Sequence, residues 1–141
     1  MTYEIVSERK VRDSGQLTNP EEVFKVVKRY AKAKQEQFIV LTLSGSHQVI
    51  SVSIVSLGLV NKTIVHPREV FNRAIRDMAT AVIVCHNHPS GKLAPSEEDL
   101  DITRRLCEAG EIIGIYVIDH LIISKSGFLS LKQQGLMDKP N

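Results

Sequence analysis

Apolar and polar positions alternate along the first half of the chain in a way that predicts one helix and two or three strands. Residues 19–22, Asn-Pro-Glu-Glu, are typical of a helix start, with a capping side chain, proline at the first helical position and acids in the first turn. We expect this helix to reach about Ala33, with four residues facing inward: Val23, Phe24, Val27 and Tyr30. Residues 38–43 predict a buried strand, and residues 48–60 a second strand that pairs back on it. Residues 3–11 alternate only partly and predict an edge strand or an ordered arm.

The second half of the chain predicts two more helices among further strands. A helix opens at Pro67, with apolar residues at helical spacing: Val70, Phe71, Ala74, Ile75 and Met78. Residues 81–85 predict a compact buried strand, residues 96–109 a helix, and residues 112–123 a strand broken near Asp119 and His120. A hairpin turn then leads into residues 128–130. This order of elements predicts an α/β fold, with a mixed sheet and helices on its faces.

Length and composition favour one soluble domain. The 141 residues match one compact domain, without repeats or a long linker, and they are enough to bury a core without disulfides or a structural metal. Two cysteines without a CxxC pair fit a reducing compartment. The charged N-terminal stretch predicts no signal peptide, and no apolar run approaches the roughly 18 residues of a membrane span. We therefore expect a cytoplasmic protein without a membrane partner.

The charge balance gives little support to nucleic-acid binding. Eighteen basic residues stand against sixteen acidic ones, and the net charge of +2 is too mild for the usual electrostatic footprint. Five cations do recur along the first predicted helix and just after it: Lys25, Lys28, Arg29, Lys32 and Lys34. We favour a solvated helix face over a phosphate-binding stripe for this group.

The chemistry that the sequence offers is concentrated in residues 84–99. On an extended backbone His86 and His88 point to the same side, about 6.6 Å apart along the strand. A turn and a helix start then return Asp99 toward them, and two imidazoles with one carboxylate form a common ligand set for catalytic zinc. Two alternatives stay open from spacing alone, because paired histidines occur without metal and Ser96-x-x-Asp99 also matches a capping box.

These residues resemble a known family. The stretch HNHPSGKLAPSEED, residues 86–99, is similar to the JAMM motif, and more closely to the RadC family of bacterial JAMM/MPN (JAB domain) metalloprotease-like proteins. Residues 65–71 and 117–122 also resemble RadC segments. The resemblance implies a single domain over residues 20–135, with an N-terminal strand or arm at 1–19 and a tail at 136–141. It also implies an MPN/JAB-type mixed sheet flanked by helices, with cytidine-deaminase-like layering.

The resemblance also implies roles for individual residues. His86, His88 and Asp99 would bind Zn²⁺, and Ser96 would support the tetrahedral intermediate. Glu36, at the entry to an apolar strand, would be the general base. Glu69 is a rival for that role, although its place in a helix start explains it without catalysis.

The leading hypothesis is a zinc-dependent hydrolase of peptide or isopeptide-like amide bonds, with a peptide or protein as substrate. The alternative is an MPN-fold binding module that acts without catalysis in a nucleic-acid or protein assembly. Longer RadC proteins carry an N-terminal helical region resembling DNA-binding modules, for which we expect no room before residue 20. Many RadC proteins also carry acids in the stretch that precedes the segment at Pro67, and the corresponding residues 53–58 contain none. We favour structural roles for the remaining candidates: a helix cap at His66, a strand histidine at His120 and a buried apolar side chain at Cys85.

Overall fold

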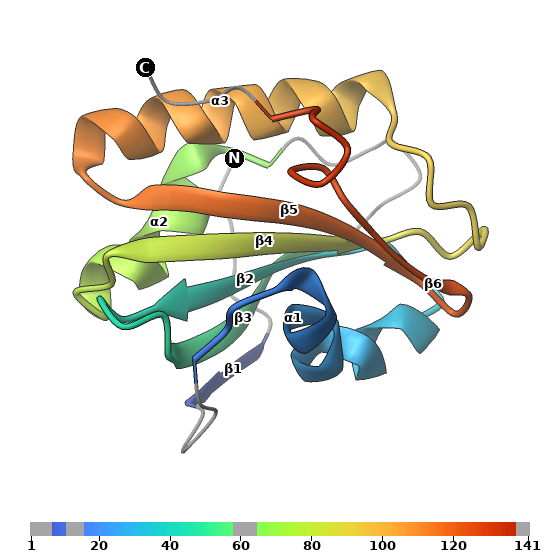
Figure 1. Ribbon diagram of the computed structural model, residues 1–141, viewed down its shortest axis with the longest axis horizontal. Helices are drawn as coiled ribbons and strands as arrows, with labels where there is room; N and C mark the ends of the chain where they lie inside the picture. The colour runs from blue at the N-terminus through green and yellow to red at the C-terminus, as the bar shows by residue number, and fades with distance from the viewer. Residues whose placement is uncertain (1–6, 11–15, 58–64, 138–141) are drawn as a thin grey trace.

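The computed structural model describes residues 7–10, 16–57 and 65–137 and places a single mixed sheet at the centre of the molecule (Figure 1). The strand order is β1-β3-β2-β4-β5-β6, and every neighbouring pair is antiparallel except β4 and β5, which are parallel. The predicted α/β fold with a mixed sheet is therefore confirmed. The strands are β1 (Ser7–Lys10), β2 (Gln37–Leu43), β3 (Val49–Leu57), β4 (Ala81–Asn87), β5 (Tyr116–Ser124) and β6 (Gly127–Ser130).

Helices cover both faces of this sheet (Figure 1). On one face lies α1 (Pro20–Val27), capped by Asn19 and continued by the 3₁₀ helix η1 (Lys28–Lys32). The other face carries α2 (Pro67–Arg76) and α3 (Glu97–Ile113). Two apolar clusters result, one between the sheet and α1 and one between the sheet and the α2/α3 pair.

Alternation along the central strands decides which side chains reach which face. In β4, Ile83 and Cys85 pack into the cluster beneath α1, whereas Val82 and Val84 pack against α2 and α3. Both faces are covered, so β4 is apolar at nearly every position, as expected for a central strand. The same alternation places His86, near the end of β4, on the α2/α3 side. The strand ends at Asn87, two residues later than predicted.

The predicted boundary between the last helix and the following strand is wrong. The apolar residues from Ile112 onward suggested a strand, but α3 extends to Ile113 and closes at Gly114, whose φ of 86° terminates the helix in the left-handed region. β5 therefore starts only at Tyr116. Short apolar runs fit a helix or a strand equally well, and the glycine decides between them here.

The inward face predicted for the second helix is also wrong at its end. Val70, Phe71 and Ala74 are buried, but the helix ends at Arg76, and Ile75 and Met78 are 53% and 84% exposed. Met78 lies beyond the helix with a φ of 52°, so helical spacing no longer applies to it.

β5 is continuous through Asp119 and His120, where a break was predicted, but it contains a bulge. Val82 pairs with Val117 and Ile83 pairs with Asp119, so Ile118 is an extra residue opposite β4. A bulge of this kind changes the alternation of the strand. As a result Val117 and His120, three residues apart, both face α2 and α3.

Several predictions lie outside the described residues. They concern residues 1–6 and 11–15 of the expected N-terminal strand or arm, residues 58–60 of the second strand, and residues 138–141 of the tail. In the described part of the chain, no helix has the length and apolar character needed to cross a membrane.

Candidate metal centre

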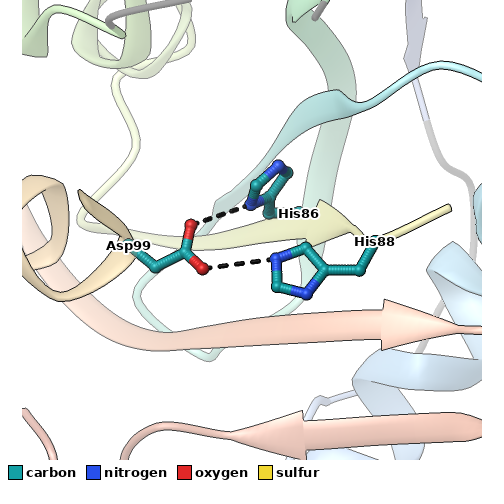
Figure 2. Close-up of side chains that lie close together, drawn as sticks. All are labelled: His86, His88 and Asp99. Atoms are coloured by element: carbon teal, nitrogen blue, oxygen red, sulfur yellow. Dashed lines mark hydrogen bonds and ion pairs between the residues drawn. The ribbon is translucent and has the colours of Figure 1, made fainter. Parts of the chain in front are cut away.

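The three predicted ligands meet where β4 ends and α3 begins. His86 is the second-last residue of β4, His88 follows the strand, and Asp99 lies in the first turn of α3. Figure 2 shows both imidazoles directed at the Asp99 carboxylate. Strand alternation puts the two histidines on one side, and the turn after His88 returns the chain so that α3 starts opposite them.

Each oxygen of the Asp99 carboxylate contacts a different imidazole. His86 Nδ1 lies 3.1 Å from Oδ1, and His88 Nε2 lies 3.2 Å from Oδ2. The two rings are perpendicular, with their centroids 4.9 Å apart. Three donor groups from two elements therefore point toward one small volume.

Asp99 also fills the structural role that the capping-box alternative assigned to it. Its Oδ2 accepts a 2.9 Å hydrogen bond from the Ser96 backbone N–H, and its own N–H donates at 3.0 Å to Ser96 Oγ. A carboxylate at the start of a helix is further stabilised by the helix dipole. The capping box and the convergence with the imidazoles coexist, and the cap orients the carboxylate toward the histidines.

The pKa values reflect these contacts. Burial raises the pKa of Asp99, but hydrogen bonds from His86 and His88 outweigh it and hold the pKa far below that of an ordinary aspartate. The hydrogen bond to Asp99 likewise raises the pKa of His88, although burial opposes this. Asp99 is therefore an anion at neutral pH.

His88 has its tautomer fixed in a form that suits a metal ligand. Its Nδ1 lies 2.9 Å from the Lys92 carbonyl oxygen, which can only accept, so Nδ1 carries a proton. The Nε2 atom, which faces Asp99, is the one left with a lone pair when the ring is neutral. Metal-binding histidines commonly donate their second N–H to a backbone carbonyl in this way.

The donor set fits zinc. Ligand atoms of His86, His88 and Asp99 all lie within 4.8 Å of one another. Zinc binds such atoms at about 2.1 Å, which puts tetrahedral ligands about 3.4 Å apart. Cys85 contributes no thiolate, because its side chain is buried on the α1 side and burial raises the pKa of the thiol. Two imidazoles and one carboxylate leave a fourth coordination position open.

The proposed base, Glu36, lies beside this group. It precedes β2, and its Oε2 is 3.5 Å from His86 Nε2, the ring nitrogen that faces away from Asp99. Its rival Glu69 lies in the first turn of α2, where it is 3% exposed and burial raises the pKa of its carboxyl. Of the two acids, Glu36 is the one that contacts a predicted ligand.

The other histidines differ in their surroundings. His66 occupies the N-cap position of α2 but makes no side-chain capping hydrogen bond there, so the predicted capping role is limited to its backbone position. His120 is fully buried, with Phe38 packed edge-on against its ring at 5.8 Å. Burial lowers the pKa of His120 to about 3, so the ring is neutral. It contacts Thr103, whose hydroxyl donates at 2.7 Å to the Asp99 carbonyl oxygen.

Sequence reasoning missed two buried polar residues next to the centre, Thr103 and Asn87. Thr103 connects His120 to the first turn of α3, and Asn87 lies between the two histidines and faces the opposite side of the sheet. The available signal was that Asn87 alternates with the two histidines on an extended backbone and so points to the opposite side, where a buried amide must find hydrogen-bond partners.

The family model for a RadC-like JAB domain matches residues 17–136. The chain belongs to this family. The predicted resemblance to RadC proteins is thus confirmed, and the match spans all of the candidate centre. A RadC-like JAB domain of this kind also accounts for the mixed sheet with helices on both faces.

Relatives of this RadC-like JAB domain are longer proteins. A UPF0758 protein of Geobacter sulfurreducens is 47% identical over 138 residues, which are 97% of this chain and 60% of that protein. A UPF0758 protein of Symbiobacterium thermophilum is 50% identical over 122 residues, covering 86% and 52%. A third, of Staphylococcus epidermidis, is 44% identical over 128 residues, covering 90% and 57%. The chain thus spans between half and three-fifths of these relatives.

Proposed function

We propose that this RadC-like JAB domain is a zinc-dependent hydrolase that cleaves peptide or isopeptide-like amide bonds. The observation that carries the proposal is the convergence of His86, His88 and Asp99, with the His88 tautomer fixed by Lys92 and the Glu36 carboxylate 3.5 Å from His86. Converging ligands, an open coordination position and an adjacent carboxylate are the parts that metal-assisted amide hydrolysis requires.

His86, His88 and Asp99 would hold the metal, and bound zinc lowers the pKa of a coordinated water from 15.7 to about 7. Glu36 would accept a proton during attack and deliver it to the leaving amine. Its side chain is 37% exposed, so a substrate can reach it. Ser96 accepts the capping hydrogen bond from Asp99 and still has its O–H to donate toward a developing oxyanion.

A binding module without catalysis is the second candidate, and the α1 side of the molecule favours it. Lys25, Lys28, Arg29 and Lys32 are all exposed along α1 and η1, and Lys34 follows them. Such a group of cations suits a nucleic acid or an acidic protein. Affinity for a DNA duplex that falls steeply with rising salt, in a protein without peptidase activity, would support this candidate.

The test of the proposed function combines zinc content with peptide cleavage. Elemental analysis should find close to one zinc per chain in the wild type and none in His88→Ala. A library of fluorescence-quenched peptides should then be cleaved by the zinc-loaded wild type. Glu36→Gln should keep its zinc and lose about 10²-fold to 10⁴-fold in kcat/KM, the usual contribution of a general base. A wild-type protein without zinc would contradict the metal site, and full activity in Glu36→Gln would contradict the assignment of Glu36 as the general base.

A further inference from the structure

Asn87 lies in β4 between the two candidate histidine ligands and has no part in the chemistry proposed above. Its side chain is completely buried, on the opposite side of the strand from His86 and His88. A side-chain amide has one acceptor oxygen and two N–H donors, and leaving these groups unpaired in the interior is costly. The hydrogen-bond partners of this amide therefore indicate its role in the structure.

All three recorded partners of the Asn87 amide belong to the segment that carries Glu36. Oδ1 accepts a hydrogen bond from the Gln37 backbone N–H, and Nδ2 donates to the Gln35 carbonyl at 2.9 Å and to the Ala33 carbonyl at 3.4 Å. Gln35 and Gln37 are the two neighbours of Glu36 in the chain. One side chain thus binds the backbone on both sides of the proposed base.

The register of the sheet explains why an amide is needed at this position. The ladder between β2 and β4 ends with the pair Phe38 and His86, and only Gln37 of β2 lies beyond it on the side toward Glu36. Asn87 supplies hydrogen bonds to the segment after the ladder has stopped. Without them, Glu36 would lie in an unpaired connection between η1 and β2.

We propose that Asn87 is a positioning residue that holds Glu36 beside the metal centre. The inference rests on the proposed function, because it concerns the base of that reaction. Through alternation, β4 presents the histidine ligands on one face and the amide on the other. Asn87 is the residue next to His86 in β4, so its hydrogen bonds hold the segment around Glu36 at a fixed position relative to this histidine. The partly exposed Glu36 carboxylate is thus positioned through the backbone of its two neighbours.

Two variants and a matched control test this role. Asn87→Ala removes all three hydrogen bonds. Asn87→Asp has the same shape and keeps the acceptor for Gln37, but loses both donors, and it serves if the alanine variant does not fold. Cys85→Ala is the control, because Cys85 is buried on the same side of β4 two residues earlier and lies outside the segment that Asn87 binds.

The first measurement is amide hydrogen exchange of the zinc-loaded proteins, with zinc content determined in parallel. In Asn87→Ala the Gln37 amide should exchange at least about tenfold faster, as expected for local opening, while amides in the middle of β2 and β4 keep their protection. Zinc content should stay at the wild-type value in all three variants. Unchanged protection of Gln37, or loss of zinc from the Asn87 variants, would overturn the proposal.

The second measurement is kcat/KM on the most rapidly cleaved quenched peptide, in the wild-type and Glu36→Gln backgrounds. Asn87→Ala should lower it about 10²-fold in the wild type, the cost of an ångström-scale misplacement, but should have little further effect in Glu36→Gln. A general structural defect would lower activity equally in both backgrounds and would overturn the proposal. So would activity equal to that of Cys85→Ala.

These outcomes separate the inference from the proposed function. A wild-type protein that binds zinc and cleaves no peptide contradicts the proposed function, and the positioning role falls with it. An active wild type whose Asn87 variants behave like Cys85→Ala contradicts the positioning role alone.

Discussion

Two buried aspartates on the α2/α3 side of the sheet differ in what surrounds them. Asp99 lies at the start of α3, near the end of β4, and Asp77 lies directly after α2, near the opposite end of β2. Their side chains are 7% and 6% exposed, and the pKa of each is lower than usual, because hydrogen bonds outweigh the effect of burial. A side chain with little exposure and a lowered pKa are thus common to both residues.

The two aspartates differ in the side chains that contact their carboxylates. Asp77 accepts hydrogen bonds from Ser51 at 2.6 Å and Thr42 at 2.7 Å, and it forms an ion pair with Arg73 at 3.0 Å. A guanidinium cation has no lone pair for a metal and hydroxyls are not among the usual zinc ligands, whereas the imidazoles around Asp99 are. A buried carboxylate thus becomes a candidate metal ligand through the groups that face it.

The largest expected effect concerns metal binding and separates the two aspartates completely. Asp99→Asn should reduce zinc from about one per chain to none, because an amide is a poor replacement for a carboxylate among zinc ligands. Asp77→Asn, the matched control at the other end of the sheet, should keep the wild-type zinc content. Elemental analysis after dialysis measures both. Equal zinc contents in the two variants would contradict the assignment of Asp99, and not Asp77, as a metal ligand.

Stability should show the reverse order. In metal-free protein, Asp77→Asn should lower the free energy of unfolding by about 2–3 kcal/mol, because it weakens a buried group of charge-assisted hydrogen bonds. Asp99→Asn should cost less, about 1 kcal/mol, since Ser96 still caps α3 and an asparagine side chain can still accept from the Ser96 backbone N–H. Urea denaturation followed by circular dichroism gives both free energies of unfolding. A larger decrease in Asp99→Asn than in Asp77→Asn would contradict this prediction.

The pH dependence of stability should depend on both carboxylates. Because each pKa is lower in the folded protein than in the unfolded chain, each carboxylate stabilises the fold above the unfolded pKa of about 3.9. That contribution is lost as pH falls further, through the folded value. The metal-free unfolding free energy should therefore decrease below about pH 4, less steeply in Asp77→Asn. Denaturation series at several pH values test this, and identical slopes in wild type and variant would contradict it.

The smallest expected effect concerns the cap of α3. Ser96→Ala should lower stability by about 1 kcal/mol, because Ser96 Oγ accepts from the Asp99 N–H. Ser96→Asn should restore the stability, since asparagine also caps a helix, but should not restore a role of the hydroxyl in peptide cleavage. Thermal denaturation and the quenched-peptide assay measured together separate the two roles. Full activity in Ser96→Asn would contradict the catalytic assignment of the serine.

Local rules predicted much of the centre. Alternation placed His86 and His88 on one side, and the turn and helix start that follow were expected to return Asp99 toward them. Spacing alone left the metal site and the capping box as alternatives, and the family resemblance identified the three residues as ligands. The start of α1 was also predicted from the sequence, and the Asn19 side chain caps the helix by accepting a hydrogen bond from the Glu22 backbone N–H.

Long-range pairing explains what the pattern could not predict. Glu36 reaches His86 because β2 and β4 are neighbours in the sheet, and spacing along the chain contains no information on that pairing. The family resemblance, not the local pattern, identified Glu36. The contacts of Asn87 were missed for the same reason, since its partners lie about fifty residues earlier. At Ile112 and Ile113 the error was local, because only the glycine that follows distinguishes a helix end from a strand.

The bulge at Ile118 makes the length of β5 as informative as its residues. Ile118 packs beneath α1, whereas His120 contacts Thr103 of α3, an arrangement that requires one residue more than regular pairing provides. Deleting Ile118 would leave Val117, Asp119 and His120 in regular pairing with β4, each on its present face, whereas deleting a paired residue such as Leu121 would exchange the two faces beyond it. In variant libraries, β5 should therefore tolerate deletion of the unpaired Ile118 better than a single-residue deletion or insertion among the residues that pair with β4.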